Sequence, residues 1–544
     1  MTYIVGLNAG SAASHDPSAC VVDERGRVLA FMEEERLSRV RHAPAQAPLL
    51  ALDRCLDLAG ITVDDVDAVA VGWDEPRMSE RQGKPWGFTS AGEFLTGLGF
   101  RASALPDLQF VPHHRAHAES AFQASSFDSA AVLVVDGNGE DESISVFHAR
   151  RGVPPTRVAC WPRVHSLGYL YEETSKWLGL SRLDAGKTMG LAAYGRSRGI
   201  EPPDWIKLTP DDGLWSLVGN HPDWDYAEIR DFWRQEIRRF SGLDRCRTAV
   251  PDLARDDLAV RVAWAAQSVV ERAIADLADL ARRSTGERNL CIAGGVGLNC
   301  AANGRLPGPL FVPPVPHDAG VAVGAAWALA RRPDREPLSP YSGDLPGHPS
   351  DVGQWQAHRT AADPDLVVGL LLQGKVGAVC RGRSEVGPRA LCHRSILASP
   401  VPADMQDRVN AVKRRERWRP FGPVSNADTG LWKSAGDLER YMVGAAELTP
   451  EGAEVLPGVT HVDHTTRPQR LGPDDEPFVD AVLTGLGGAG HPSVLINTSF
   501  NGPGQPVVET ADQALRCAAT LGLDFLVLND DLFISRQDTS RHAG

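Results

Sequence analysis

The stretch over residues 131–140, AVLVVDGNGE, decides the fold because it repeats a pattern already present at the start of the chain. An apolar strand over 131–135 runs into a polar turn, Asp136-Gly137-Asn138-Gly139-Glu140, and a second strand candidate follows over 143–148. The earlier copy has strand candidates over 3–7, 19–22 and 28–31. Two such hairpins about 128 residues apart indicate an internal duplication.

Two facing hairpins would offer backbone N–H groups to a phosphate, which is typical of the actin, sugar-kinase and Hsp70 (ASKHA) type of ATPase fold. The alternative is a pair of unrelated hairpins in an α/β protein. Helices are predicted over 47–59 and 258–281, and a small-residue helix for close packing over 320–331. A strand over 289–293 runs into Gly294-Gly295-Val296-Gly297-Leu298-Asn299, where we expect the next helix to begin.

Composition restricts the class of protein. A length of 544 residues suggests three to four domain-sized units, and 42% hydrophobic residues suffice for several cores. The net charge of -14 argues against coating nucleic acid or an anionic membrane. The N-terminus has no basic segment before its apolar stretch, and no apolar run is long enough to span a membrane, so we expect a cytoplasmic protein. Nine scattered cysteines indicate reduced, mostly buried thiols.

A proline-rich segment over 331–351 marks the predicted domain boundary. We expect an N-terminal domain over 1–350 and a C-terminal α/β domain over 360–544, with a capping box at Thr510 and Gln513. Residues 198–257 are the probable insertion, which either stacks on an acceptor or forms a satellite core. It carries Trp205, Trp215, Trp224 and Trp233.

The sharpest local signal is His113-His114-Arg115-Ala116-His117. In a helix, His113 and His117 lie four residues apart on one face, a spacing that suits one metal ion, although such a pair is more often two structural histidines. Asp136 and Asp318 lie at turns where they could complete a mixed shell. Imidazole and carboxylate ligands fit iron, manganese or zinc better than magnesium.

Two further segments indicate anion binding. The glycine-containing run over 184–195 has one cation, Lys187, and is expected to be a loop along a nucleotide, although it lacks the P-loop spacing. In the C-terminal part, cations gather at Arg389, over 413–419 and at Arg467, near Asn497. Aromatic and proline residues among them favour an ordered pocket for a small phosphorylated ligand over a nuclear-localisation or RNA patch.

Taken together, these stretches resemble the O-carbamoyltransferases of the nodulation-factor, cephem-antibiotic and tobramycin type. The likeness also includes His15-Asp16-Pro17-Ser18-Ala19 and Glu33-Glu34-Glu35-Arg36-Leu37-Ser38-Arg39, and it covers nearly the whole chain. It implies an ASKHA-type N-terminal domain and a C-terminal domain similar to YrdC, the type that makes a carbamoyl adenylate. Two positions depart from the family pattern, because Cys392 and His464 stand where the family usually has glycine.

The resemblance implies a role for each matching residue. It makes His113, His117, Asp136 and Asp318 the ligands of a divalent metal, expected to be iron, with magnesium or manganese as alternatives that accompany the nucleotide. ATP and carbamoyl phosphate would bind Arg389, Lys413, Arg419, Arg467 and Asn497. Further nucleotide contacts are predicted at Gly137, Lys187, Gly294, Gly295 and Asn299. His15, Arg389 and Lys413 are the predicted catalytic residues. The alternative for His15 is a loop residue or a residue that supports a metal ligand without touching the substrate.

The predicted function is ATP-dependent transfer of a carbamoyl group from carbamoyl phosphate, through carbamoyl-AMP, to a hydroxyl of a small natural product. The partner would be that acceptor, with neither nucleic acid nor membrane involved, and the oligomeric state is not determined by the sequence. The alternatives are an ASKHA-type small-molecule kinase and a tRNA threonylcarbamoyl-transferase-like protein. A kinase would leave the C-terminal cations unexplained, and the net charge argues against a tRNA partner.

Overall fold

In the computed structural model, residues 2–9, 15–81, 87–202, 208–209, 214–215, 224–330, 338–353, 355 and 359–535 are described. Five of the strands form a first sheet in the order β3-β2-β1-β4-β5. These strands are β1 (Tyr3–Asn8), β2 (Ser18–Asp23), β3 (Val28–Glu33), β4 (Val66–Val71) and β5 (Asp107–Phe110). The first three pair antiparallel, and β4 and β5 join parallel to β1.

The second sheet repeats the first one strand for strand, in the order β8-β7-β6-β11-β12. Its strands are β6 (Ser129–Val135), β7 (Glu142–Arg150), β8 (Val153–Pro162), β11 (Leu290–Ala293) and β12 (Leu310–Phe311). Again three strands form an antiparallel meander and the last two add in parallel. The predicted duplication and α/β class are therefore confirmed.

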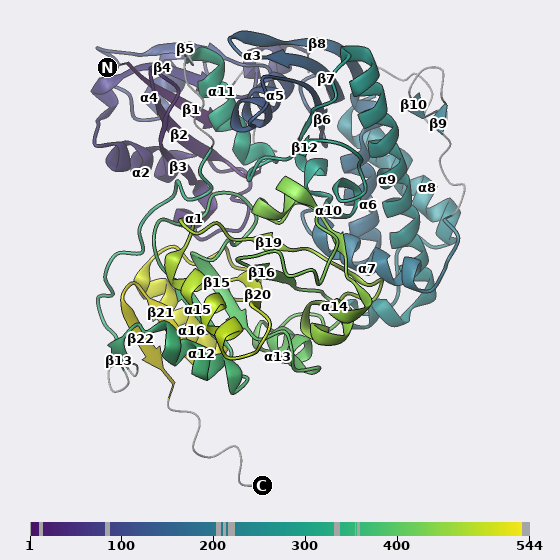
Figure 1. Cartoon of the computed structure of the whole chain (residues 1–544). Helices are drawn as coiled ribbons and strands as arrows, with labels where there is room; N and C mark the ends of the chain where they lie inside the picture. The colour runs from purple at the N-terminus through teal and green to yellow at the C-terminus, as the bar shows by residue number, and fades with distance from the viewer. Residues whose placement is uncertain are drawn as a thin grey trace.

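Helices separate and cover the two sheets (Figure 1). Helix α11 (Val321–Leu329) packs on the first sheet and against α5 (His113–Ala124), which packs on the second. The contact is close because a Cβ atom on Gly324 would lie 1.9 Å from the carbonyl oxygen of Ala116, and one on Gly6 would lie 2.0 Å from that of Ala322. The small-residue helix predicted for close packing is thus confirmed.

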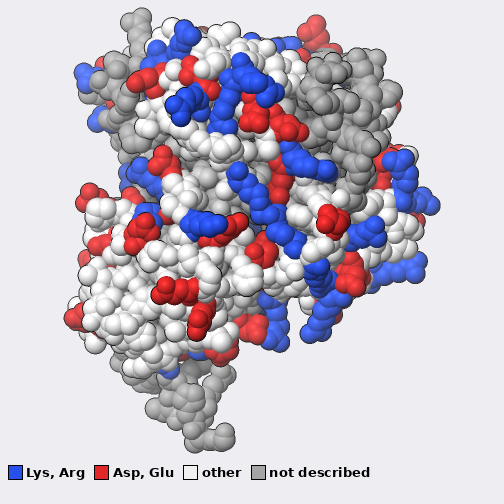
Figure 2. All heavy atoms as spheres, turned by 45° about the vertical axis from the view of Figure 1, so that its right-hand side comes forward, with Lys and Arg blue, Asp and Glu red and all other residues white. Residues whose placement is uncertain are grey.

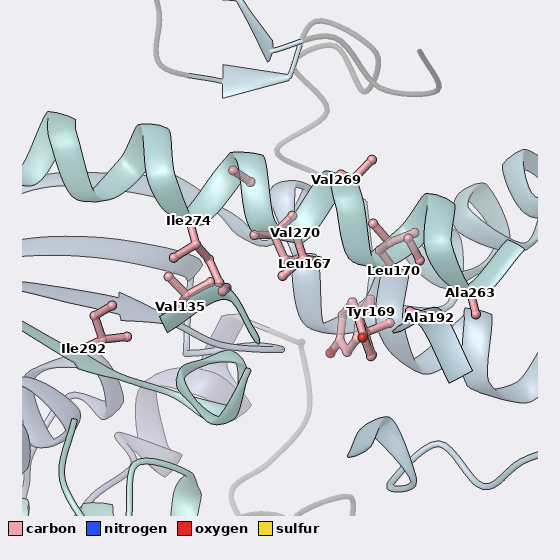
Figure 3. Close-up of a cluster of buried hydrophobic side chains, with 14 of the residues drawn as sticks. Val135, Leu167, Tyr169, Leu170, Ala192, Ala263, Val269, Val270, Ile274 and Ile292 are labelled. Carbon is pink, nitrogen blue, oxygen red and sulfur yellow. The ribbon is translucent and has the colours of Figure 1, made fainter. Parts of the chain in front are cut away.

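The outer faces of both sheets are also covered. Helix α2 (Leu49–Ala59) packs on β2 and β3 and ends, as predicted, at Gly60 with a left-handed backbone. Helix α9 (Asp257–Thr285) covers the second sheet, and α6 (Leu167–Trp177) and α7 (Ala185–Ser197) pack against α9. Figure 3 shows this core, where Val270 and Ile274 of α9 lie near Val135.

The remaining elements of the N-terminal half are short, apart from the 16-residue helix α8. They are α1 (Glu34–Ser38), α3 (Glu75–Arg81), α4 (Ala91–Gly97), β9 (Leu208–Thr209), β10 (Leu214–Trp215), α8 (Tyr226–Ser241) and α10 (Cys300–Asn303). Single 3-10 turns occur at Val63–Asp65, Arg163–His165, Val250–Arg255, Gly295–Leu298 and Asp318–Gly320. The helix expected after Gly294 is therefore only a 3-10 turn followed by α10, because the chain turns back at Gly304, where a Cβ atom would overlap Ala445.

The C-terminal half contains one mixed sheet of eight strands, in the order β13-β22-β21-β14-β15-β20-β16-β19. The strands are β13 (Arg359–Ala361), β14 (Gly377–Cys380), β15 (Arg394–Ala398), β16 (Gly422–Ser425), β19 (Gln469–Arg470), β20 (Val494–Ser499), β21 (Phe525–Leu528) and β22 (Asp531–Ile534). The apolar runs of the sequence predict strands over 376–380, 395–398, 494–497 and 525–528, and all four are present. A separate pair joins β17 (Ala446–Glu447) to β18 (Thr465–Thr466).

Helices cover both faces of this sheet. Helices α12 (Pro364–Leu372) and α15 (Pro477–Gly488) pack on one face, and α13 (Met405–Val412) and α16 (Ala511–Leu521) on the other. Helix α14 (Pro450–Val455) and 3-10 turns at Gly436–Tyr441 and Pro457–Val459 lie in the connections. The capping box predicted for α16 is half formed: Thr510 accepts from the backbone of Gln513, whose own side chain accepts from Glu509.

The predicted insertion lies only partly within the described residues. Trp233 of α8 is fully buried and Trp224 packs against the same core, which also contains Val135 and Ile274, so these two tryptophans belong to the main core of the second sheet rather than to a satellite core. Trp205 lies outside the described residues. All nine cysteines are described and all are free thiols, seven of them buried, as predicted. Within the described part of the chain, no helix is long and apolar enough to cross a membrane.

Candidate functional site

The two predicted metal-binding histidines open helix α5, which begins directly after Pro112. Both side chains are completely buried, and their Nε2 atoms are 3.1 Å apart. The rings meet edge to face, with centroids 4.5 Å apart. A spacing of four residues on one helix face therefore brings both imidazoles to a single point.

Two carboxylates complete this cluster, which we call the metal site: His113, His117, Asp136 and Asp318. Asp136 directly follows β6, and its Oδ2 lies 3.2 Å from Nε2 of His113 and 3.7 Å from Nε2 of His117. Asp318 begins the turn before α11, with Oδ1 3.8 Å and 3.7 Å from the same two nitrogens. One possible ligand atom from each residue lies within 4.8 Å of the others.

The surroundings fix the orientation of these ligands. Nδ1 of His113 lies 3.0 Å from the carbonyl oxygen of Gly72, an acceptor only, so Nδ1 carries the hydrogen and Nε2 is free to bind a metal. Trp73 stacks on His113 with centroids 3.6 Å apart, and its indole N–H donates to Asn8. Oδ1 of Asp136 accepts from the backbone N–H of Gly295 at 2.8 Å, which leaves Oδ2 facing the histidines.

The electrostatics of the metal site fit a bound cation. Burial lowers the pKa of His117, but hydrogen bonding to Asp136 and Asp318 outweighs it and raises that pKa to about 9. Burial raises the pKa of Asp136, whereas hydrogen bonds and the charges of His113 and His117 hold it well below its usual range. Two buried carboxylates facing two imidazoles are a donor set for a divalent metal of the iron, manganese or zinc type.

His15 is held by its neighbour. Its Nδ1 lies 2.8 Å from Oδ2 of Asp16, whose Oδ1 lies 2.7 Å from Nδ1 of His42. Burial lowers the pKa of His15, but the hydrogen bond and charge of Asp16, with smaller contributions from Asp318 and Asp136, raise it to about 10. In the metal-free protein His15 therefore already carries a proton at neutral pH and cannot accept another.

The C-terminal cations form a second cluster, which we call the anion pocket: Arg389, Lys413, Arg415, Arg419 and Arg467. Burial and the charge of Arg467 lower the pKa of Arg389 to about 9. The Nε atoms of Arg389 and Arg467 are buried and have no hydrogen-bond acceptor within the described part of the chain. Half-buried guanidinium groups that lie close together and leave buried Nε atoms without an acceptor are a donor set that suits an anion.

The structure adds Arg415, which the sequence did not single out, because five of the seven residues over 413–419 are basic. Its guanidinium lies 4.0 Å from the ring centre of Phe421, and its Nε donates to Asn410 at 2.5 Å. Burial lowers its pKa well below the usual range, and the charges of Arg419 and Arg467 lower it further. Arg415 therefore lies near both Arg419 and Arg467, two of the predicted cations.

Lys413 and Asn497 are the most deeply buried of the predicted C-terminal residues. Nζ of Lys413 donates to the backbone of Ser499 and, at 2.9 Å, to Oδ1 of Asn501, while burial lowers its pKa well below the usual range. The amide of Asn497 in β20 donates to the carbonyl of Ala390 at 3.0 Å. It thereby supports the loop that carries Arg389.

The segment over 184–195 is not a loop: the prediction there was wrong. It forms helix α7, whose glycines allow close packing, since a Cβ atom on Gly195 would lie 2.5 Å from Trp264. Lys187 in its first turn pairs with Asp184 at 3.1 Å and with Glu416 at 3.4 Å. Because Glu416 also pairs with Arg419 at 3.5 Å, Lys187 adjoins the anion pocket.

The glycine turn after β11 connects the two clusters. Gly294 has φ +90°, and a Cβ atom there would lie 2.2 Å from the carbonyl oxygen of Val135, so only glycine fits. Gly295 binds Asp136 at one end of the turn. At the other end Asn299 caps α10 and exchanges hydrogen bonds with Gln267, so its side chain is engaged within the protein. The next residue, Cys300, influences the pKa of Arg389.

Gly137 lies beside Asp136 and packs against Gly168, where a Cβ atom would lie 2.6 Å from its Cα. Its carbonyl accepts from Ser166 at 2.6 Å. Glu140, in the same turn, accepts from the backbone N–H of His113 at 2.9 Å and of Asp74 at 2.8 Å. The sequence placed Glu140 in the repeated turn without a role, and only the folded chain shows that it anchors the start of α5.

The two departures from the resembled family pattern occur at left-handed backbone positions. Cys392 has φ +83° and His464 has φ +58°. Glycine adopts these angles without strain, whereas other residues are disfavoured there. The local geometry is nevertheless kept: Cys392 donates its backbone N–H to Ser395 at 3.0 Å, and His464 donates to the carbonyl of His461 at 2.9 Å.

Family models and relatives match this chain along most of its length. A carbamoyltransferase N-terminus model matches residues 88–327, and a carbamoyltransferase C-terminus model matches residues 368–535. Nodulation protein NolNO of Sinorhizobium fredii is 32% identical over 99% of this chain and 82% of its own. The 3'-hydroxymethylcephem-O-carbamoyltransferase of Amycolatopsis lactamdurans is 28% identical over 95% of this chain and 97% of its own.

Similarity to solved structures is more distant. Component A of the (R)-2-hydroxyglutaryl-CoA dehydratase of Acidaminococcus fermentans is 13% identical with a TM-score of 0.34, over 60% of this chain and 97% of that one. The duplicated fold is shown by the two matching strand orders.

Proposed function

The chain belongs to the carbamoyltransferase family, and we propose that it transfers a carbamoyl group from carbamoyl phosphate, by way of carbamoyl-AMP, to a hydroxyl of a small natural product. ATP is the proposed second substrate. In the proposed sequence, water cleaves carbamoyl phosphate into carbamate and inorganic phosphate. A carbamate oxygen then displaces pyrophosphate from the α-phosphate of ATP, and the acceptor hydroxyl finally displaces AMP from carbamoyl-AMP. The single observation that supports this proposal best is the pair of half-buried arginines, Arg389 and Arg467, whose buried Nε atoms have no acceptor within the described part of the chain.

The anion pocket suits the first half of this reaction. Carbamoyl phosphate and ATP are both polyanions, so bringing their reacting oxygens together requires cations on more than one side. Arg389 and Arg467 supply planar donors, and Lys413 supplies a compact positive charge. Arg415 is stacked on Phe421 and therefore adds charge from a fixed direction. We propose that these residues bind the phosphates and hold the attacking oxygen of carbamate near the α-phosphate of ATP.

The metal site suits the second half. His113, His117, Asp136 and Asp318 would hold the metal, with iron as the proposed occupant, and a metal here would supply Lewis acidity for the carbamoyl carbonyl or its phosphate. Trp73 and Gly72 hold His113 in the tautomer that ligation needs. Burial lowers the pKa of His15, but Asp16 is the main cause of its rise, so we propose that His15 serves as a protonated imidazole beside this cluster, the alternative to its role as the base that takes the acceptor's proton.

The acceptor is proposed only as a class. The named relatives include an enzyme for a cephem hydroxymethyl group, and we propose a comparable hydroxyl on a small molecule. Figure 2 shows acidic and basic side chains interspersed on the visible face, a distribution unlike the basic stripe that nucleic acid requires. We also propose that the reaction takes place in the cytoplasm, where carbamoyl phosphate and ATP would be available.

The test incubates the full chain with ATP, carbamoyl phosphate and Fe²⁺ and a panel of hydroxylated compounds: a 3'-hydroxymethyl cephem, an aminoglycoside and a macrolactam. The expected result is carbamoyl-phosphate-dependent release of AMP and pyrophosphate, with one product gaining the mass of a carbamoyl group. Release of ADP without any need for carbamoyl phosphate would instead support a small-molecule kinase. A salt-sensitive gel shift with tRNA would support the tRNA alternative.

A pair of variants tests the anion pocket. Arg389→Ala should lower carbamoyl-phosphate-dependent exchange of pyrophosphate into ATP by more than about 100-fold, because one directed cation is lost. Arg408→Ala is the matched control, since this arginine of the same domain donates only to the carbonyl of Gly374 at an exposed position. Equal exchange in both variants would show that Arg389 is not part of the pocket.

A further inference from the structure

We infer that Glu33 is a positioning residue that fixes the anion pocket relative to the metal site through one buried carboxylate. This inference rests on the proposed function, in which an intermediate formed at one site is used at the other. Glu33 ends β3 of the first sheet and is only 4% exposed. It belongs to neither site, but it contacts the loops that carry Arg389 and Asp318.

On one side, Glu33 binds the loop of Arg389. Its Oε2 accepts the backbone N–H of Gly387 at 3.0 Å, and the carbonyl oxygen of Gly387 accepts from Nη2 of Arg36 at 3.0 Å. The same guanidinium nitrogen donates to Glu33 at 3.3 Å. Both backbone polar groups of Gly387 are thus held by one acid and one base of the N-terminal half, two residues before Arg389.

On the other side, Glu33 contacts the loop of Asp318. Its Oε1 lies 3.7 Å from Nε2 of His317, the residue that precedes this predicted ligand. Gly387 lies against the same loop, since a Cβ atom on it would be 2.4 Å from the carbonyl oxygen of Pro314. A displacement of either loop therefore changes the contacts that the other makes with Glu33.

General stability alone explains this arrangement poorly. A buried carboxylate costs desolvation free energy, and burial raises the pKa of Glu33 although Arg36 opposes the effect. Other contacts already join the two halves without touching either site: Arg39 donates to the carbonyls of Val507 at 2.6 Å and Pro506 at 2.8 Å. What Glu33 contributes beyond such contacts is a fixed position of the Arg389 loop against the Asp318 loop.

The test measures amide hydrogen exchange of the full chain with and without Mn²⁺, at subsaturating and saturating metal. In the wild type, Mn²⁺ should slow exchange in the segment over 315–321 and also in the segment over 386–391. In Glu33→Ala the first effect should remain and the second should fall at least about fivefold, because a coupling free energy is lost. Glu33→Gln, which keeps an acceptor for Gly387, should retain part of the second effect.

Arg39→Ala is the matched control, because it removes an arginine contact between the same halves without altering Gly387 or His317. It should lower stability yet keep the protection by Mn²⁺ in both segments. Unchanged protection of residues 386–391 in both Glu33 variants would overturn the inference, as would equal loss in Arg39→Ala. A wild type whose segment over 315–321 does not respond to Mn²⁺ would instead contradict the metal site, which keeps the two failures distinguishable.

Discussion

The two sheets of the N-terminal half share one strand order, yet their equivalent strand ends carry different chemistry. The first strand of one sheet ends at Asn8, whose amide donates to the carbonyl of Asp16 at 2.8 Å and whose oxygen accepts from Trp73 at 3.0 Å. The first strand of the other leads to Asp136, which faces His113 and His117. The duplicated fold thus supplies two similar positions. An asparagine at the first supports neighbouring residues, whereas an aspartate at the second is a candidate metal ligand.

The largest expected effect comes from removing the charge at the second strand end. Asp136→Asn should lower Mn²⁺ affinity by more than about 100-fold, because a carboxylate ligand becomes neutral, while its oxygen can still accept from Gly295. Asn8→Ala should cost only about tenfold, through loss of the bond that orients Trp73 against His113. Isothermal titration with Mn²⁺ measures both, and equal losses would remove the distinction between ligand and support.

The glycines that follow the fourth strand of each sheet should also differ. Gly294→Ala should destabilise the protein by at least about 3 kcal/mol, because the new Cβ overlaps backbone at φ +90°. Gly72→Ala should cost about 1–2 kcal/mol, since its nearest atom is Cγ2 of Val321 at 2.8 Å. Urea midpoints give the comparison. A larger shift for Gly72→Ala would contradict the view that the Gly294 turn is the more constrained of the two.

The metal affinity of the site beside the second sheet should depend on pH. Because the pKa of His117 is raised from 6.5 to about 9, the metal-free folded protein keeps this proton through neutral pH, and a metal must displace it. Apparent Mn²⁺ affinity should therefore rise about tenfold per pH unit from 6.5 toward 9 and then level off. A flat profile over this range in titration calorimetry would show that His117 is not a ligand.

Because the pKa of His117 is raised, an increase in pH should lower the stability of the folded protein, whereas it should raise the metal affinity. Since the folded pKa of His117 lies above the unfolded one, its contribution to stability is fully present below pH 6.5 and is lost as the pH rises to about 9. Metal-free wild type should thus lose stability across this window. His117→Asn should lose less, and urea midpoints measured in the presence of a chelator would compare the two.

The smallest expected effect concerns backbone strain alone. At Gly294, by contrast, a side chain would meet both backbone strain and steric overlap. His464 has φ +58° and is exposed, so His464→Gly should relieve strain without losing packing and stabilise the protein by up to about 1 kcal/mol. Cys392→Gly should be near neutral, because its thiol is buried and contacts Gln469 at 3.5 Å. Destabilisation by His464→Gly would show that its side chain makes a contact that compensates the strain.

Strand positions were predictable because they follow from local patterns. The repeated hairpins, the strand before Gly294 and the four C-terminal strands follow from apolar runs bounded by turn residues, and the spacing of His113 and His117 places both on one helix face. The segment over 184–195 was mistaken for a loop because Gly195 packs against Trp264 and Gly190 against Pro420, residues distant in sequence. Contacts of that kind leave no local pattern.

The residues of the candidate sites also fall into two groups: those that a local sequence pattern predicts and those that only the folded chain reveals. Residue type and spacing alone selected His113, His117, Asp136 and Asp318, and the structure brings all four together. Glu140 and Glu33 were not selected, because each acts through partners far along the chain, and Arg415 was not distinguished from its basic neighbours. The buried carboxylate of Glu33, for example, binds Gly387 more than 350 residues away.

By itself, the sequence determined the α/β class, the duplicated hairpins and the residue types of both sites, because strands, turns and helix faces depend on neighbours a few positions apart. Only the tertiary structure decided how the two sites are related. The Gly294 turn connects Asp136 to the neighbourhood of Arg389, and Glu33 joins the Arg389 loop to the Asp318 loop. These relations depend on backbone atoms meeting across the fold, which no local pattern encodes.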